Sequence, residues 1–258
     1  MMYKNRCKSI SIIIAFIMNF CSVASHAQHD SSAHSTSAYI TAAAGIGISP
    51  RTLFLPSGNS TWNDYVMPGY SFSCSGGIPV LHLHKVTFGI LALFGYYSNW
   101  FNMDKYMNYL TSTDPNKSTY SKSQSGAYTQ YSIMGGAYIS RIIGKTTVEL
   151  SVMGGLAADI LPNTSYFETY APPVHYSMLI TQTFSAKAGA GLDAGVQVNY
   201  PLGKSMSATF GCHYLMSACS YTNTMYEGNN PNGLTSAPLT AYLQMINALA
   251  GLTYSFGK

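Results

Sequence analysis

Apolar and polar side chains alternate with a period of two along one long stretch of the chain. From Phe184 to Tyr200, every even-numbered position is apolar and every odd-numbered position is small or polar. A period of two places successive side chains on opposite faces of an extended strand, whereas a helix would mix the two sets at every turn. The pattern therefore predicts one long β-strand with an apolar face and a polar face.

The same alternation recurs elsewhere and gives eight candidate strands in all. The clearer stretches are 40–48, 66–78, 148–160 and 206–216, and the weaker ones are 86–101, 126–141 and 239–256. Long polar connections alternate with short ones. The long connections are 50–64, 102–125, 162–181 and 221–238, and the short ones lie near Leu81–Lys85, Ile142–Lys145 and Pro201–Lys204. This order is typical of a bacterial outer-membrane barrel with periplasmic turns and external loops, and an even strand number would leave both termini periplasmic.

The composition supports a membrane barrel over other membrane or soluble folds. Charged residues make up 9% of the chain, against about 25% in an ordinary soluble domain. Mean hydropathy is only +0.08, and beyond the amino terminus no segment offers the ~18 consecutive apolar residues of a spanning helix. A closed barrel is the other structure that satisfies every backbone hydrogen bond inside lipid. We therefore predict an all-β fold, an eight-stranded antiparallel transmembrane barrel of up-and-down topology.

A soluble barrel or sandwich is the alternative all-β fold. Its second face would meet water, so that face should carry many Lys and Glu side chains. Here the second face consists mainly of Gly, Ser, Thr and Asn, with a few isolated charges. This composition favours a narrow lumen lined by small side chains, with the apolar face turned toward lipid. At eight strands, side chains should fill that lumen, and we expect no open pore.

The amino terminus has the three-part layout of a secretory signal. Lys4, Arg6 and Lys8 precede an apolar stretch, and Ser25-His26-Ala27 provides the small residues of a cleavage site before Gln28. We expect a signal peptide over residues 1–27 and a barrel domain over 28–258. Removing the signal leaves ten basic and nine acidic residues of the thirteen and nine in the full chain. The apparent basicity is thus mostly a targeting feature, and nucleic-acid binding is not expected.

Isolated polar residues on the inward face must find partners, because an unpaired buried charge is costly. A hairpin centred near Gly203 would place Asp193 opposite His213. We expect this pair to be structural, an ion pair or hydrogen bond inside the lumen. The alternative is a catalytic dyad in which the acid orients the imidazole, but buried pairs with no nucleophile nearby are usually structural.

Three further charged residues belong to the inward-facing set. Folding the 162–181 loop symmetrically would bring Asp159 near Lys187, and Glu149 faces the same way. We expect Asp159 and Lys187 to form a second lumenal pair. These residues complete the predicted set of structural polar residues in the barrel interior.

Two other sequence features raise the question of chemistry. His175, Ser177 and the nearby Glu168 resemble the site of lipid A deacylases, in which a His is followed two residues later by a Ser. A match this short favours chance. His82 and His84 share one face of an extended segment, but two ligands make a weak metal site. The sequence therefore predicts no catalytic residue, no metal site and no cofactor.

Aromatic and cysteine positions follow the same alternation. Aromatic residues gather where strands meet connections, and we expect them to form membrane-interface girdles. They are Tyr96, Tyr97, Trp100 and Phe101 at one end and Tyr200, Tyr254 and Phe256 at the other. Cys74 and Cys212 fall on the apolar face and Cys219 on the other, and all three are expected to be packing residues.

On these patterns the chain resembles the small outer-membrane barrels of the OmpA/OmpX type, particularly the outer-membrane β-barrel domain proteins of Bacteroidota. Gln28 after the cleavage site and the final segment Leu252–Lys258, with Phe256 near the end, are typical of that group. The resemblance implies membrane lipid and lipopolysaccharide as surroundings, and the barrel-assembly machinery as a partner during insertion. Such barrels serve several functions. We expect a non-enzymatic structural or interaction protein whose external loops contact a ligand; the alternatives are a lipid-modifying enzyme and a narrow channel or transporter.

Overall fold

The computed structural model describes residues 37–55, 66–83, 85–113, 118–170, 177–186, 188–227 and 234–256. The signal segment predicted for residues 1–27 lies outside them. No helix within these ranges is long and apolar enough to cross a membrane.

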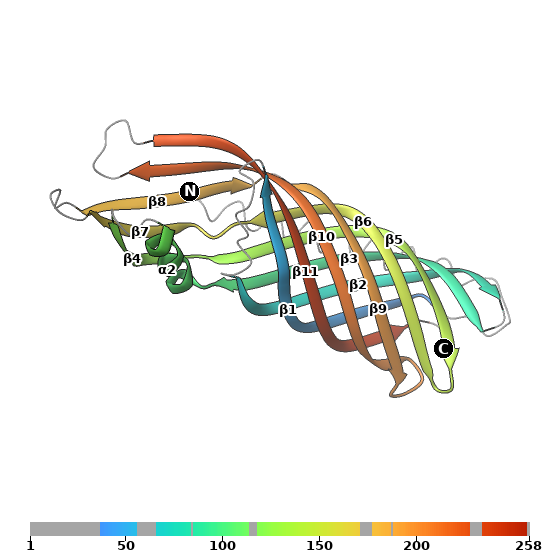
Figure 1. Cartoon of the computed structure of the whole chain (residues 1–258). Coiled ribbons are helices and arrows are strands. Elements are labelled where there is room, and N and C mark those ends of the chain that lie inside the picture. Colours follow the sequence, from blue (N-terminus) through green and yellow to red (C-terminus); the bar gives the residue numbers. More distant parts are fainter. Residues whose placement is uncertain are drawn as a thin grey trace, which may run out of the picture.

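Eight antiparallel strands form a closed barrel in the described part of the chain (Figure 1). They are β1 (Tyr39–Leu55), β2 (Val66–Leu83), β3 (Val86–Phe101), β5 (Ala127–Ile143), β6 (Thr146–Ile160), β9 (Gly189–Pro201), β10 (Met206–Glu227) and β11 (Leu234–Ser255). Each strand pairs with its neighbour, and β11 pairs with β1 to close the barrel. The predicted eight-stranded antiparallel fold is confirmed.

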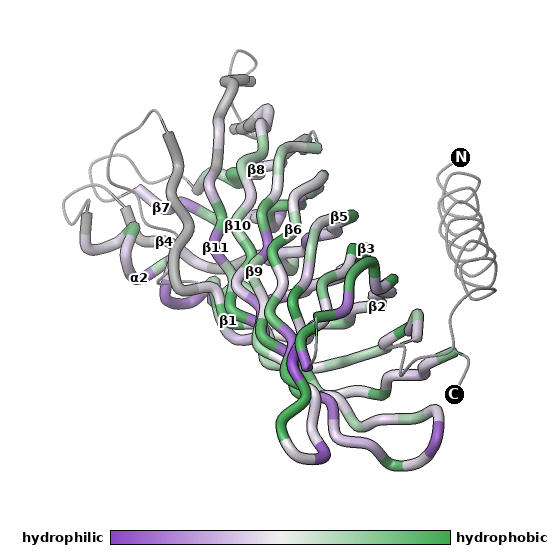
Figure 2. Tube along the Cα trace, turned by 90° about the vertical axis from the view of Figure 1, so that its right-hand side faces the viewer, coloured by the Kyte–Doolittle hydropathy of each residue, from purple (hydrophilic) through white to green (hydrophobic). Residues whose placement is uncertain are grey.

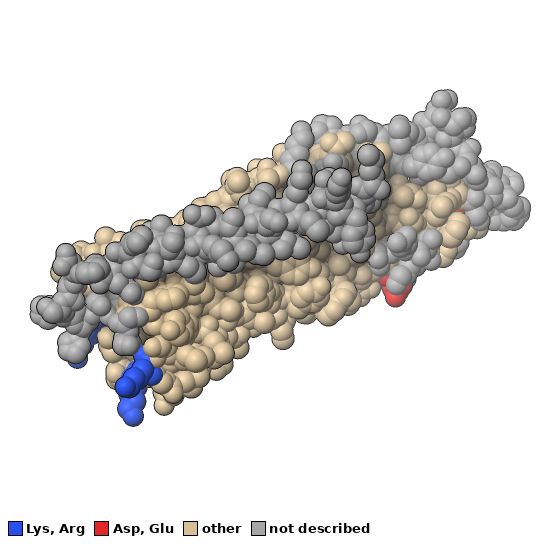
Figure 3. All heavy atoms as spheres, turned by 180° about the vertical axis from the view of Figure 1, so that it is seen from behind, with Lys and Arg blue, Asp and Glu red and all other residues tan. Residues whose placement is uncertain are grey.

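The apolar face of the strands points outward and the polar face inward, as the alternation predicted. Val152, Leu192 and Phe210 point outward with exposed fractions of 67%, 61% and 57%, whereas Asp193 and Asp159 point inward and are buried. Apolar residues recur along the strands of the barrel (Figure 2), and the described part of the wall on the side seen in Figure 3 carries almost no charge. A wall this apolar is stable only in contact with lipid, so the chain is a transmembrane barrel.

The lumen is more apolar than its predicted lining of small and polar residues. Large buried side chains from most strands form one interior cluster that includes Leu91, Met134, Tyr97, Met153 and Leu215. The three weaker strand patterns have this physical cause: β3, β5 and β11 carry apolar residues on both faces. Small and polar residues such as Asn99 and Ser132 are buried there too, so the expected lining is present but shares the lumen with large apolar side chains.

Beyond the barrel, three shorter strands and one helix form a folded extension that we call the platform. Its elements are α2 (Met103–Thr113), β4 (Ser118–Ser125), β7 (Thr164–Tyr170) and β8 (Ser177–Ala186). β8 pairs with the distal part of β10, β7 pairs with β8, and β4 pairs with β7. Much of the four predicted polar loops is thus regular structure, because these segments continue the hydrogen-bonded ladders of the barrel strands.

The platform has a hydrophobic cluster of its own. Met103 and Met107 of α2 pack with Tyr166 of β7 and with Met178 and Ile180 of β8, and all five are buried. The helix begins after Asn102, whose side-chain oxygen accepts a hydrogen bond from the Lys105 amide at 3.0 Å, as an N-terminal cap does. The helix therefore covers the face of β7 and β8 that carries these three buried side chains.

Several of the aromatic residues predicted as girdle members lie exposed on the wall, but two of them face inward. Trp100, Tyr200 and Tyr254 are about half exposed on the wall, whereas Tyr97 and Phe101 are buried. Adjacent residues of a strand point to opposite faces, so Tyr96 and Tyr97 could not both contact lipid. Cys212 is exposed and Cys219 buried, as the alternation predicted, and Cys74 is partly exposed.

Candidate functional site

The polar centre of the lumen is the pair formed by Asp193 of β9 and His213 of β10. The His213 Nδ1 lies 2.9 Å from the Asp193 Oδ1, and both side chains are buried. The residue directly opposite Asp193 is Leu215, not His213, because the β9–β10 pairing is centred on Lys204. The two side chains therefore meet diagonally across the strands, and the predicted register is wrong by two residues.

Gly195 makes this diagonal contact possible. It lies directly opposite His213, and a Cβ at that position would come within 2.6 Å of the His213 ring. The imidazole thus occupies the space above the glycine and reaches toward Asp193. Such close approach is a common reason for glycine inside a strand.

A second polar network lies toward the platform and contains Asp159 of β6. Ser217 donates a hydrogen bond of 2.7 Å to the Asp159 carboxylate. Gln130 in turn donates to the Ser217 hydroxyl at 2.9 Å. The predicted partner Lys187 lies outside the described residues. Asp159 therefore accepts a hydrogen bond from the neutral Ser217 hydroxyl of β10, which Gln130 of β5 holds in turn.

A third network lies toward the short turns and joins four strands through hydroxyl groups. Thr209 donates to the Asn199 side-chain oxygen at 2.7 Å and lies 2.6 Å from the Thr253 hydroxyl. The Thr253 hydroxyl is also 2.7 Å from that of Thr41. Gln197 donates to the same Asn199 oxygen at 3.1 Å. These contacts connect β1, β9, β10 and β11, and they cross the β11–β1 pairing that closes the barrel.

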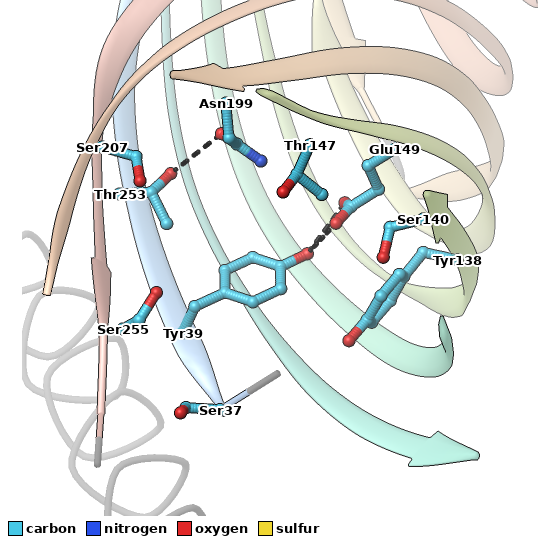
Figure 4. A pocket seen from close by; sticks show the side chains of 10 residues that line it. All are labelled: Ser37, Tyr39, Tyr138, Ser140, Thr147, Glu149, Asn199, Ser207, Thr253 and Ser255. Atoms are coloured by element: carbon cyan, nitrogen blue, oxygen red, sulfur yellow. Dashed lines mark hydrogen bonds between the residues drawn. The ribbon is translucent and has the colours of Figure 1, made fainter. Parts of the chain in front are cut away.

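Glu149 faces a small cavity at the short-turn end. The Tyr39 hydroxyl lies 2.8 Å and 2.7 Å from the two Glu149 carboxylate oxygens. The cavity measures about 80 Å³, and Figure 4 shows Tyr138, Asn199 and Thr253 among the side chains around it. A polar cavity of this size is large enough to admit water. Glu149 and Tyr39 thus hold each other at the lumen mouth.

The lumen geometry is that of a packed core. Side chains at each described level are almost fully buried, from Tyr39 at the mouth through Met153 to Asp159. Ser151 lies beside Gly195, but no hydrogen bond joins it to His213. A Ser–His dyad would need that contact to activate the hydroxyl. The described residues contain no group of three or more His, Cys, Asp or Glu side chains that could hold a metal ion.

The second candidate set is only partly described. His175 lies outside the described residues, and Ser177 is the first residue of β8. Glu168 lies on β7, where it accepts a hydrogen bond of 3.3 Å from the Tyr120 hydroxyl of β4. Ser177 pairs with Thr169 in the β7–β8 ladder, next to Glu168.

Sequence reasoning did not name several residues that carry the lumenal networks. Tyr39, Asn199, Thr209 and Thr253 all lie at inward-facing positions of strands that the alternation had found. Their facing direction was therefore available from the sequence. Their partners depend on the registers across β9, β10, β11 and β1, which alternation alone does not provide.

Comparisons with known proteins identify similar folds. No protein-family model and no curated relative matches the sequence. Among solved structures, neisserial surface protein A is 13% identical, with 85% of this chain and 97% of that chain covered and a TM-score of 0.42. OprG from Pseudomonas aeruginosa is 10% identical, with coverage of 89% and 100% and a TM-score of 0.47. The protease OmpT from Escherichia coli is 9% identical, with coverage of 88% and 99% and a TM-score of 0.44.

These structures are small outer-membrane barrels, and they include both an enzyme and proteins of other kinds. The similarity concerns fold and does not select a function. For this chain, the transmembrane assignment follows from its own closed barrel and apolar outer wall.

Proposed function

We propose that this chain is a non-enzymatic integral protein of the bacterial outer membrane that presents its platform to a partner outside the cell. The observation that carries the proposal is a contrast between the two parts of the molecule. The lumen is filled by side chains that pack against one another, whereas the platform has a separate hydrophobic cluster beyond the barrel. A filled lumen suits neither transport nor substrate entry.

The outward side of the platform offers apolar contacts to such a partner. Phe167 of β7 and Leu179 of β8 are 41% and 37% exposed, and they pair with each other across the two strands. Aromatic side chains at solvent-exposed positions on a rigid sheet are typical of protein contact sites. The platform therefore combines a hydrogen-bonded sheet with an apolar contact patch.

The proposal places the short turns in the periplasm and the platform outside. A cysteine at Ser121 of β4 should react with a membrane-impermeant maleimide on intact cells. A cysteine at Lys204, in the β9–β10 turn, should react only after the cells are permeabilised. Wild-type protein measures the background from the native cysteines, and the reverse labelling pattern would refute the orientation.

Contact with a partner is tested by site-specific photocrosslinking in intact cells. A benzoylphenylalanine at Phe167 should give a discrete crosslinked product, and the same probe at Tyr200, on the wall at the other end, should give none of that size. Absence of any product at both Phe167 and Leu179 would contradict the proposal. Two further results would also contradict it: a conducting pore in planar bilayers, or lipid A that changes mass when the protein is produced.

A further inference from the structure

Three basic side chains lie near one another at the short-turn end of the barrel, and we call Lys85, Arg141 and Lys145 the basic corner. Arg141 lies near the end of β5, Lys85 between β2 and β3, and Lys145 in the turn after β5, and all are exposed. The Ile142 amide donates a hydrogen bond of 3.2 Å to the Lys85 carbonyl, and Arg141 pairs directly with Val86. The β2–β3 connection therefore lies against the end of β5.

Arg141 faces outward, toward lipid. Its neighbour Ser140 is buried in the lumen, so Arg141 shares the outer face with Ile139. Ile139 is opposite Phe88 on β3 and Leu150 on β6. These three apolar side chains are 38%, 39% and 54% exposed. Arg141 thus lies one step beyond a continuous apolar row on the wall.

The basic corner has no neutralising partner among the described residues. No ion pair involves any of its three side chains, and Glu149 on the adjacent strand is 4% exposed and turned into the lumen. In Figure 3 the basic side chains in view lie at one end of the wall. At the platform, by contrast, Asp104 and Lys105 place both signs side by side on α2.

Exposed aliphatic side chains immediately flank the cations. Leu83 and Ile143 are 53% and 58% exposed at the ends of β2 and β5. Aliphatic groups next to lysines suit the membrane interface, where apolar stems lie in hydrocarbon and charged heads reach the phosphates. These turns therefore lie at the level of the lipid headgroups and not out in water.

We propose that the basic corner binds the phosphate of a membrane phospholipid whose acyl chains lie along Phe88, Ile139 and Leu150. An arginine guanidinium pairs with phosphate oxygens through two parallel hydrogen bonds, and two lysines add point charges. The apolar row directly below Arg141 favours a lipid over free phosphate. This inference requires only the transmembrane barrel and holds for either orientation of the platform, so it stands or falls separately from the proposed function.

The test is native mass spectrometry of the folded full-length chain in a neutral detergent, with dioleoylphosphatidylglycerol as the probe. Dioleoylglycerol is the matched control because it has the same acyl chains and lacks the phosphate. The phosphatidylglycerol complex should dominate. Removal of each cation should weaken binding about fivefold, which corresponds to about 1 kcal/mol per basic residue near an anionic surface.

The informative variants are Arg141→Gln and the double variant Lys85→Gln/Lys145→Gln, with Lys204→Gln as the control that removes a charge from the same end. Heat-modifiable gel migration checks that each variant is folded. Weaker binding in the first two by about these factors, with Lys204→Gln unchanged, supports the site. Equal retention of both lipids, equal weakening by Lys204→Gln, or displacement of the lipid by millimolar inorganic phosphate would each overturn it.

Discussion

At the scale of single residues, glycines decide which bulky side chains fit inside this barrel. A Cβ at Gly77 would lie 2.4 Å from the Tyr39 ring, and one at Gly195 would lie 2.6 Å from His213. Both rings belong to the polar networks of the lumen, since Tyr39 contacts Glu149 and His213 contacts Asp193. The glycines therefore position the polar groups by leaving space for the two rings.

The variant Gly195→Ala tests this dependence. The new methyl group overlaps the His213 ring, so we expect the free energy of unfolding to fall by about 1–3 kcal/mol, the usual effect of overpacking. Gly211→Ala is the matched control, because its Cβ would meet nothing closer than 3.4 Å. Urea unfolding in detergent micelles, followed by intrinsic fluorescence, measures both. An equal effect of the two variants would contradict the account.

The pair Asp193 and His213 gives a second prediction at this scale. His213→Ala leaves a buried carboxylate without its partner, and we expect a loss of about 3–5 kcal/mol in unfolding free energy. Adding Asp193→Asn should recover part of the loss, because the isosteric amide has no charge to desolvate. The same unfolding assay applies. If the double variant is less stable than His213→Ala, the pair is not held as described.

The sequence predicted the inward direction of these residues and a contact between Asp193 and His213, but not the diagonal register in which the two side chains meet. A turn centred one residue later moves His213 from directly opposite Asp193 to a diagonal position. Alternation is insensitive to this difference, because both registers keep the same residues inside. The hydroxyl chain from Thr41 through Thr253 to Asn199 depends on three registers at once, so the sequence could not specify it.

At the scale of elements, the strands with the weakest alternation are those that form the apolar part of the lumen. On β3, Leu91 and Leu93 point inward while Phe88 and Ile90 point outward. Both faces are apolar, so the period of two fades although the strand is long. A weak pattern in this chain therefore marks a strand that packs on both sides.

The helix α2 was predicted as part of a loop, although its sequence carries helical signals. Asn102 caps the first turn, and Met103, Tyr106, Met107 and Leu110 recur at the spacing of one helix face. The helix is 11 residues long. Its apolar pattern is short and lies within a polar segment, so the segment was predicted to be a loop. Its packing partners Tyr166 and Met178 come from distant segments and could not be identified from the sequence.

Packing of α2 on the platform gives the prediction for this scale. Met107→Ala removes a buried side chain at a cost of about 2–5 kcal/mol, so the platform should loosen. Limited proteolysis should cut residues 102–125 faster, while heat-modifiable migration of the barrel stays unchanged. Tyr109→Ala on the exposed side of α2, where the side chain is 46% exposed, should have no such effect. If both variants are cut alike, α2 is not anchored by this cluster.

At the scale of the whole molecule, the wall requires apolar side chains at the depth of the hydrocarbon. Val152→Arg on the middle of β6 should lower stability by about 2–4 kcal/mol, and the same change near the interface should cost about 0–1 kcal/mol. Val80, near the short-turn end of β2, provides that control and is 68% exposed. Refolding equilibria in lipid vesicles measure both. Equal costs at the two positions would be inconsistent with a membrane-spanning wall.

The most direct test of the central claim is labelling of the wild-type protein in vesicles by a lipid-soluble carbene reagent, followed by peptide mass spectrometry. Similar apolar side chains lie on both faces, which makes the comparison internal to one molecule. The account predicts label on Val152, Leu192 and Phe210. It predicts protection of the buried set on the same or neighbouring strands, which is Met153, Leu215 and Met245. Label on the second set with protection of the first would show that the apolar wall does not face lipid.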